Sequence, residues 1–272
     1  MKIRTSLQSD WERFDTLSQN ESWRVPALER KLFLSAWRHD AGALIKDELF
    51  CGLVTAVAHD KSGWIGNLIV PVELRGQGYG GFLFRWAVKK LLRDHVTSIW
   101  LTASEQGRPI YEREGFEIVD RIERWVLQPR QGVWTDVTAG RESWTYLSNF
   151  DQQVWGESRS VLLNTLQKNN QSFCCDDSVA LLQCDNEMQI IGPWYSKDPC
   201  SRSNRKLLQQ LIAVANPSVE IVVDLLASSP IRSLLAAAGF QPAGETALMA
   251  SGESSQVDFK KMIALASLGS VG

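Results

Sequence analysis

The sequence has few histidines and no cysteine pair at a metal-binding spacing. Its 272 residues include three histidines and five cysteines, an odd number with no C-x-x-C pair. They are His39, His59 and His95, and Cys51, Cys174, Cys175, Cys184 and Cys200. Because the histidines are scattered, they give little support to a metal cluster or to a Ser-His-Asp catalytic triad. The cysteines are typical of reduced thiols, so we expect a cytoplasmic protein without a metal.

The chain also lacks a charge excess and a long apolar run. Its 29 Lys and Arg against 31 Asp and Glu give a net charge of −2, which disfavours nucleic acid and anionic membranes as partners. No apolar run approaches the roughly 20 residues that cross a bilayer. The first residues, MKIRTSLQSDWERFD, lack the apolar centre of a signal peptide. The apolar content of 44% is ordinary for a folded chain.

A glycine-rich turn follows a strand-like run and opens an amphipathic helix. The run is IGNLIVPV, residues 65–72, and the helix spans about residues 80–94. The turn consists of Arg75, Gly76, Gln77, Gly78, Tyr79 and Gly80. The first N–H groups of a helix have no intrahelical partner, and together with the helix dipole they attract phosphate. The turn therefore predicts a pyrophosphate-bearing ligand.

One interpretation of this turn is a dinucleotide site. The fingerprint G-x-G-x-x-G is satisfied by Gly76, Gly78 and Gly81, and Glu105 follows the next strand as a ribose-binding acid would. That fingerprint opens a series of βαβ units. Here it follows two strand-like runs, residues 43–45 and 50–58, whose tight turns indicate an antiparallel meander. An NAD-dependent oxidoreductase is therefore the weaker alternative.

A longer match favours another ligand. The stretch LIVPVELRGQGYGGFLF resembles the acetyl-CoA-binding segment of the GNAT acetyltransferases, R/Q-x-x-G-x-G/A, with Arg75, Gly78 and Gly80 in its fixed positions. The later segment YEREGF, residues 111–116, resembles the Y-E-K-x-G-F end of that family's fourth helix. The two motifs occur in the family's order with a strand between them. The resemblance implies a domain that uses acetyl-CoA as co-substrate.

The order of the predicted elements agrees with this resemblance and suggests a duplication. Residues 1–128 read as β-α-α-β-β-β-α-β-α-β, and residues 129–141 are rich in turn formers, which indicates a linker. Residues 142–272 repeat the pattern weakly, with Gly239 at an offset of 124 from Gly115. We expect an α/β (α+β) fold of two tandem GNAT-like domains. Each would have a mixed, mostly antiparallel sheet flanked by helices.

The second half lacks the glycine turn, because the equivalent loop, residues 195–202, contains no glycine. Without glycine the backbone cannot approach a pyrophosphate closely, so we expect no CoA binding there. This half resembles the degenerate C-terminal domain of a tandem-GNAT subfamily with the pattern D-x-x-x-F-G-x-x-R. Asp151, Gly156 and Arg159 match it, and Trp155 replaces Phe. The resemblance implies a domain that completes the acceptor pocket.

The acceptor-binding candidates in the second half are Asp151, Trp155, Arg159 and Asp224. Two carboxylates, Asp151 and Asp224, could hold a cationic amine in a cleft between the domains. An equally open alternative is that each caps a helix or turn. The tryptophan could form a wall of the substrate site or belong to the core.

By family resemblance, backbone groups of Leu68, Ile69 and Val70 hold the pantetheine arm, with one N–H facing the thioester oxygen. Ser104 stands where the family often has Asn, and Arg108 could supply a further CoA contact. Tyr111 occupies the family's position for the general acid. A phenol with a pKa near 10 is protonated at neutral pH and can donate to a departing thiolate. The alternative is a tyrosine at the edge of the core. No single base is identified, so deprotonation through water stays open.

The function that we expect is N-acetyl transfer from acetyl-CoA to a primary amine of an unidentified small molecule or peptide, by direct attack in a ternary complex. The main alternative is a non-catalytic acyl-CoA-binding or sensor protein that keeps the CoA site without turnover. Both a monomer and a homodimer are compatible with the sequence.

Overall fold

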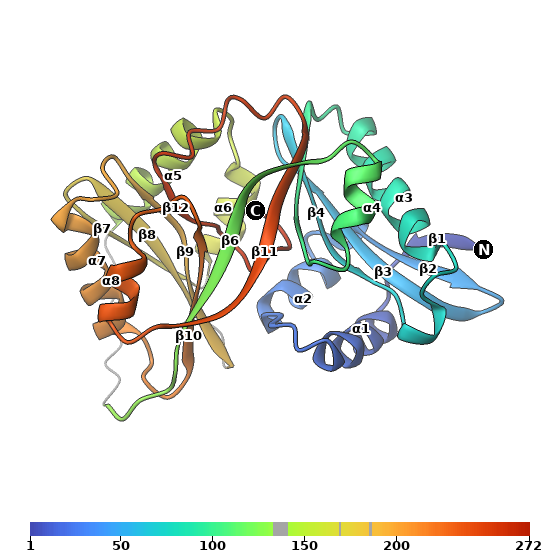
Figure 1. The fold of residues 1–272 in the computed structure, drawn as a ribbon, viewed down its shortest axis with the longest axis horizontal. Helices are drawn as coiled ribbons and strands as arrows, with labels where there is room; N and C mark the ends of the chain where they lie inside the picture. Colours follow the sequence, from blue (N-terminus) through green and yellow to red (C-terminus); the bar gives the residue numbers. More distant parts are fainter. Residues whose placement is uncertain (133–140, 169, 185–186) are drawn as a thin grey trace. The chain divides into compact units, whose positions relative to one another are not determined.

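The fold was analysed in a computed structural model that describes residues 1–132, 141–168, 170–184 and 187–272 (Figure 1). The chain forms two compact units that exchange short segments. The first unit contains Met1–Glu117, Met249–Glu253 and Leu268–Gly272. The second contains Ile118–Leu248 and Ser254–Ser267. No helix of the described residues combines the length and apolar character needed to cross a membrane.

The first unit is built around a sheet with strand order β1-β2-β3-β4-β5, next to which lies the end of β11. The strands are β1 (Lys2–Thr5), β2 (Ala41–Lys46), β3 (Leu49–Ala58), β4 (Ser62–Ile69), β5 (Ser98–Ala103) and β11 (Gln241–Gly252). The helices are α1 (Gln8–Asn20), α2 (Ala27–Leu34), α3 (Tyr79–Arg93) and α4 (Arg108–Arg113), with short 3-10 turns η1 (Arg38–Asp40) and η2 (Val72–Leu74). Strands β1 to β4 pair antiparallel, and β4 pairs parallel with β5. The expected meander is thus present.

Helix α3 forms because its apolar residues recur on one face. Leu83, Phe84, Ala87 and Leu91 are all buried, at the i, i+1, i+4 and i+8 spacing of an amphipathic helix. Two strand glycines let this face come close to the sheet. A Cβ atom added to Gly63 would lie 2.7 Å from Leu91, and one added to Gly52 would lie 2.8 Å from Leu83. The helix therefore lies directly on the strands β3 and β4 that lead into the glycine turn.

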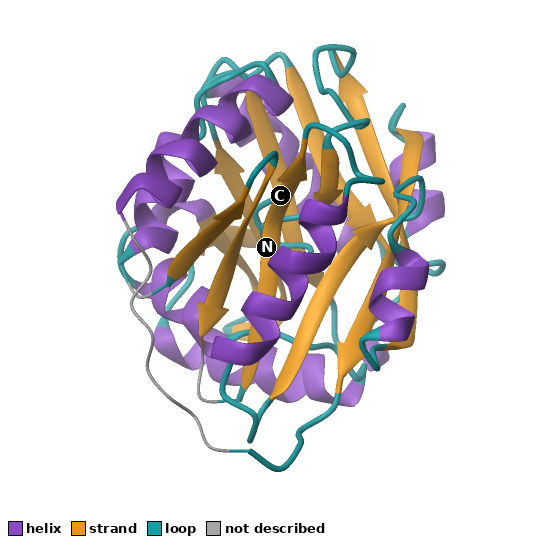
Figure 2. Cartoon of the chain, turned by 90° about the vertical axis from the view of Figure 1, so that its left-hand side faces the viewer, coloured by secondary structure: helices purple, strands orange, loops and turns teal. Residues whose placement is uncertain are grey.

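The second unit has the strand order β11-β6-β10-β12-β9-β8-β7. Its strands besides β11 are β6 (Glu117–Leu127), β7 (Gln171–Cys175), β8 (Ser178–Cys184), β9 (Met188–Ser196), β10 (Glu220–Leu226) and β12 (Met262–Ala264). Its helices are α5 (Arg141–Trp155), α6 (Ser160–Gln167), α7 (Arg202–Val214) and α8 (Arg232–Ala237). Helices α5 and α7 pack against β7 and β8 (helices purple and strands orange in Figure 2). The expected fold class, mostly antiparallel sheets flanked by helices, is confirmed.

The compact units differ from the predicted division of the chain. The prediction places residues 121–127 in a first domain of residues 1–128, whereas β6 pairs with β10 of the second unit, from Ile122↔Leu226 to Leu127↔Ile221. A strand's apolar pattern shows that one face is buried without specifying which strand it pairs with. The roles of the two predicted domains stay predictions. The predicted linker, residues 129–141, falls largely on residues 133–140, outside the described residues.

We predict that Gly52→Ala destabilises the first unit by about 1–3 kcal/mol more than Gly115→Ala. Both glycines have positive φ, +148° and +83°. A Cβ on Gly52 would lie 2.5 Å from the Ile69 carbonyl oxygen and 2.8 Å from Leu83, whereas a Cβ on Gly115 would meet nothing within 4 Å. Urea denaturation of both variants measures the difference. Equal losses would contradict the tight contact between β3 and the end of β4.

Candidate functional site

A cavity of 850 Å³ in the first unit lies where β4 ends and α3 begins. Of the eleven predicted cofactor-binding residues, nine line it. They are Leu68, Ile69, Val70, Arg75, Gly76, Gly78, Tyr79, Gly80 and Ser104. The other two lie outside its lining: the side chain of Gln77 donates to the Glu73 carbonyl, and Arg108 pairs with Glu112. The structure therefore brings most of the predicted site together around one cavity.

Two glycines line this cavity just before α3 begins. Gly76 and Gly78 have φ of +75° and +83°, a region that favours glycine, and a Cβ on either would meet nothing within 4 Å. Gly78 is the N-cap of α3, so no side chain caps the helix start there. The first N–H groups of α3 are thus left for an external acceptor. This open concave end of a helix fits a phosphate group.

Strand β4 carries an irregularity beside the cavity. Its register with β3 shifts between Thr55↔Gly66 and Leu53↔Ile69, and Asn67 within the shift has φ of +52°. Two β4 residues therefore oppose one on β3, which is the count of a β-bulge. Bulges redirect the strand that carries them, so β4 bends just before it reaches the glycine turn.

Strands β4 and β5 also part at this point. Their parallel ladder ends at Ile65↔Leu101, although β4 continues to Ile69 and β5 to Ala103. Beyond the last pair, the backbone groups of β4 that face β5 are left without a ladder partner in that strand. Backbone N–H and C=O groups need hydrogen bonds, so this edge can bind a ligand with amide groups. The two strands thus splay beside the glycine turn.

Several charged residues surround the cavity. Arg75 donates from Nε to the Val70 carbonyl (3.1 Å) and pairs through Nη2 with Glu21 Oε1 (2.6 Å), which fixes the start of the turn. Two further arginines, Arg85 and Arg113, line the cavity and were missed by the sequence interpretation. A Cβ on Gly81 would lie 3.2 Å from Arg85 Nη1. Gly81 and Arg85 are four residues apart and therefore share a face of α3. From the sequence, this spacing could have indicated that Arg85 lies near the glycine turn.

Tyr111, the predicted general acid, lies on α4 and is 7% exposed. Its ring packs on Phe84, with the ring centroids 5.0 Å apart. Burial raises the pKa of the Tyr111 phenol to about 12. The tyrosine does not itself line the cavity, but its neighbour Ile110 does. A Cβ on Gly107, which also lines the cavity, would lie 3.6 Å from Tyr111 Oη. The hydroxyl is thus close to the cavity wall and stays protonated at neutral pH.

In the second unit, three of the predicted acceptor-binding residues form one buried cluster. Asp151 accepts from Arg159 Nε (3.1 Å) and Nη2 (2.6 Å) and from Tyr195 Oη (2.6 Å). The Arg159 guanidinium carbon lies 4.1 Å from the Trp155 ring centroid. Asp151, Trp155 and Arg159 are at most 2% exposed. Their contacts are those of a structural ion pair, and the acceptor-binding role stays a prediction.

The structure does not bring Asp224 into that cluster. Asp224 is 2% exposed and accepts two bonds of 2.7 Å from Arg124, which lies opposite it in the β6–β10 ladder. A bidentate bond of this kind satisfies both carboxylate oxygens. The pair holds together two strands that are far apart in the sequence, and an acceptor-binding role for Asp224 also stays a prediction.

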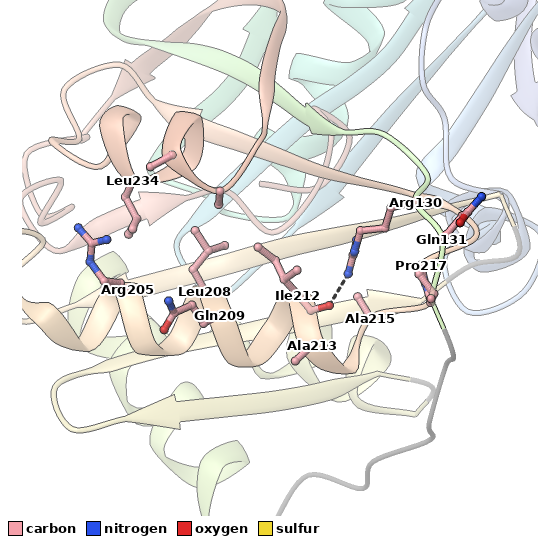
Figure 3. Close-up of a pocket in the computed structure, with 13 residues that line it drawn as sticks. Arg130, Gln131, Arg205, Leu208, Gln209, Ile212, Ala213, Ala215, Pro217 and Leu234 are labelled. Carbon is pink, nitrogen blue, oxygen red and sulfur yellow. Dashed lines mark hydrogen bonds between the residues drawn. The ribbon is translucent and has the colours of Figure 1, made fainter.

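The second unit differs from the first at the start of its corresponding helix. Ser201 is the N-cap of α7, and its hydroxyl accepts from the backbone N–H of Ser203. The end of α7 is also occupied, because Arg130 donates to the Ile212 carbonyl beside a 460 Å³ cavity (Figure 3). That cavity is lined by apolar side chains such as Leu208, Ile212 and Leu234 and by polar ones such as Arg205 and Gln209. A self-capped helix offers fewer N–H groups to phosphate than α3 does.

A strand also fills the gap between β9 and β10. Their parallel ladder ends at Val222↔Ile190, and beyond it β12 pairs with both strands, through Leu225↔Ala264 and Tyr195↔Met262. The backbone groups that are left open between β4 and β5 are thus satisfied here by the chain itself. Together with the capped α7, this supports the expectation that the second unit binds no CoA, which stays a prediction.

Part of the sequence matches a family model, and several solved structures share the fold. Residues 4–116 match the sequence model of the Acetyltransferase (GNAT) family. None of the curated proteins searched matches the chain. Among solved structures, the chain is similar to a provisionally assigned acetyltransferase from Pyrococcus horikoshii, with 18% identity, a TM-score of 0.80, and coverage of 100% of this chain and 95% of that one.

Two further solved structures are similar over most of their length. One is a GCN5-related N-acetyltransferase from Sphaerobacter thermophilus, with 16% identity, a TM-score of 0.66, and coverage of 92% of this chain and 95% of that one. The other, a GCN5-related N-acetyltransferase from Anabaena variabilis, has 10% identity, a TM-score of 0.57, and coverage of 99% and 84%. At these identities the likeness shows the fold, and it extends over both units.

We predict that Asp151→Asn costs about 3–5 kcal/mol of stability, because it leaves the Arg159 charge buried without its partner. Asp258→Asn is the control, since it removes a partly exposed ion pair with Lys261 (2.9 Å) and should cost less than about 1 kcal/mol. Urea denaturation compares the two. A stable Asp151→Asn variant would contradict a structural role and favour ligand binding by this carboxylate.

Proposed function

We propose that the first unit transfers acetyl from acetyl-CoA to a primary amine of a small molecule or peptide, because residues 4–116 match the model of the GNAT acetyltransferase family. The observation that carries the proposal is the juxtaposition of two features at one cavity. The β4–β5 ladder ends where the glycine turn opens α3. A helix start suited to phosphate thus lies next to a strand edge suited to the amides of pantetheine.

Residues of the turn and of two helices would hold the pyrophosphate. The first N–H groups of α3, at Tyr79 and Gly80, can donate to phosphate oxygens, because Gly78 places no side chain over them. Arg85 and Arg113 line the same cavity and supply positive charge. The ion pair of Arg85 with Glu114 (3.4 Å) is exposed and therefore weak, so Arg85 can turn toward a phosphate.

Backbone groups of Leu68 to Val70 would hold the pantetheine arm and polarise the thioester carbonyl, as an oxyanion site does. The amine nitrogen attacks the carbonyl carbon, the new C–N bond forms, and the C–S bond breaks. Tyr111 donates from its hydroxyl to the departing sulfur. The ammonium product of the attack loses its proton to water. This direct transfer needs both substrates bound together.

A non-catalytic acyl-CoA-binding protein is the second candidate function. The burial of Tyr111 and its absence from the cavity lining favour it. Amine-dependent formation of an acetylated product excludes this candidate. An NAD-dependent oxidoreductase is disfavoured, because β4 is reached through the antiparallel meander β2-β3-β4 and the fingerprint requires a series of parallel units.

We predict that acetyl-CoA raises the melting temperature of the wild-type protein and not that of Gly78→Glu, because the carboxylate would occupy the phosphate site. Gly115→Glu is the matched control: both glycines have φ of +83°, and a Cβ on either meets nothing within 4 Å. It should keep the shift, whereas NAD should shift neither protein. Thermal-shift assays with acetyl-CoA, CoA and NAD test this. No shift of the wild type by either CoA ligand would refute acetyl-CoA binding.

We predict that Tyr111→Phe lowers kcat by about a hundredfold with little change in acetyl-CoA binding, because a donor to the departing sulfur acts only as the bond breaks. Tyr79→Phe should act mainly on the KM for acetyl-CoA, since Tyr79 lines the cavity.

The pH dependence of kcat tests the same assignment. The raised pKa of Tyr111, about 12, keeps the phenol protonated beyond pH 10, where an ordinary tyrosine is half ionised. Tyr111 therefore stays protonated as the pH rises to 10. The kcat of the wild type and that of Tyr111→Phe should have the same pH dependence up to pH 10. A tyrosine-dependent fall below pH 10, or an unchanged kcat in Tyr111→Phe, would contradict the role.

A further inference from the structure

The last described residues of the chain lie within the first unit, on strand β4. We call residues 268–271 the strap. The Gly269 carbonyl accepts from Trp64 Nε1 (3.0 Å), and the Val271 carbonyl lies 3.2 Å from His59 Nε2. Ser270 and Val271 are both 2% exposed. The strap is therefore packed against the unit by specific contacts.

The strap lies on the face of β4 away from α3. Residues 63 to 66 of β4 pair regularly with β3, so their side chains alternate between the two faces. Gly63 faces Leu91 of α3. Trp64 and Gly66 therefore face the opposite side, where they meet the strap.

The strap crosses the sheet at the place where β4 and β5 part. A Cβ on Gly66 would lie 2.6 Å from Ser270 Cα, and a Cβ on Gly269 would lie 2.5 Å from Thr102 Oγ1. Gly66 and Thr102 are the first residues after the last ladder pair, Ile65↔Leu101. Gly66 of β4 and Gly269 of the strap thus both lie in the contact. A side chain at either position would hold the backbones of the strap and the sheet apart.

This placement matters for the transfer proposed above, on which the inference rests. Helix α3 lies on one face of the sheet at this point, and its first residues line the cavity. An acyl group held against Leu68 to Val70 on that face can be reached from the other face through the opening between β4 and β5. We propose that the strap closes this opening on the acceptor side and so limits the access of water and amine to the acyl group.

The same stretch of chain supports this assignment independently. Strand β12, a few residues before the strap, occupies the corresponding gap between β9 and β10 in the second unit. There the chain pairs with both strands and fills the gap, whereas at β4 and β5 it lies across one face of the sheet. Two neighbouring segments of the chain thus lie at the two gaps: β12 pairs as a strand in one, and the strap lies across the other.

The test displaces the strap and measures hydrolysis of acetyl-CoA without an amine. In Gly269→Ala the new methyl group collides with Thr102 Oγ1, and in Gly66→Ala it collides with Ser270. Either variant should raise amine-independent CoA release roughly tenfold, because water then reaches the thioester. CoA is measured by chromatography, since the exposed Cys174, Cys184 and Cys200 would react with a thiol reagent.

Two companion variants separate displacement of the strap from general damage. Gly269→Ala combined with Thr102→Ala removes the colliding oxygen and should return hydrolysis toward the wild-type rate. Gly244→Ala alters a glycine with φ of +144° in open space and should leave hydrolysis unchanged. The acetyl-CoA thermal shift should be the same in all of them, which shows that the folded site is kept.

Wild-type hydrolysis in both strap variants, with the acetyl-CoA shift intact, would overturn the inference while leaving the proposed function standing. The same holds if the Thr102→Ala companion fails to lower the rate of Gly269→Ala. Failure of the proposed function has another pattern: the wild type shows no acetyl-CoA shift and no CoA release with lysine or spermidine as the amine. In that case the inference falls with it.

Discussion

The candidate site depends on one backbone feature, the end of the β4–β5 ladder after Ile65↔Leu101. Up to that pair the backbone groups of the two strands satisfy each other, and beyond it those of β4 need other partners. The bulge at Asn67 redirects β4 just past the same point, and the strand then leads into the turn that starts α3. Side chains alone could not create an amide-binding edge next to a phosphate-binding helix. The parted strands place both on one cavity.

The two units differ at two places where backbone groups either stay open to a ligand or bond within the chain. At the helix start, Gly78 leaves the N–H groups of α3 open, whereas Ser201 uses its own hydroxyl to cap α7. Between the strands, β4 and β5 stay apart, whereas β12 pairs with both β9 and β10. Both differences replace a ligand's hydrogen bonds with the chain's own. These two differences are the physical basis of the prediction that the second unit binds no CoA.

Local patterns predicted the parts of the site that depend on neighbouring residues. The glycine turn, the helix after it and the antiparallel meander before it are short-range features, and the structure contains all three. Long-range pairing was not predictable in this way: the apolar pattern of β6 fits either sheet, and only the structure shows that it pairs with β10. The Asp151 motif was recognised, but its spacing could not reveal that Tyr195 donates to the carboxylate and Trp155 donates to Tyr195. Arg113 likewise reaches the cavity only through the placement of α4.

The raised pKa of Tyr111 bears on how it would assist the reaction. An alkyl thiol such as that of cysteine has a pKa near 8.5, about 3.5 units below the value of about 12 for this phenol. Full transfer of the phenolic proton to a thiolate would therefore be uphill. A hydrogen bond donated to the sulfur as negative charge develops needs no such transfer and still lowers the barrier. Because the thiolate is the weaker base, Tyr111 can keep its proton throughout, and the ammonium product supplies the proton that leaves. On this argument the hydroxyl of Tyr111 would act in the proposed transfer as an electrostatic donor that keeps its proton.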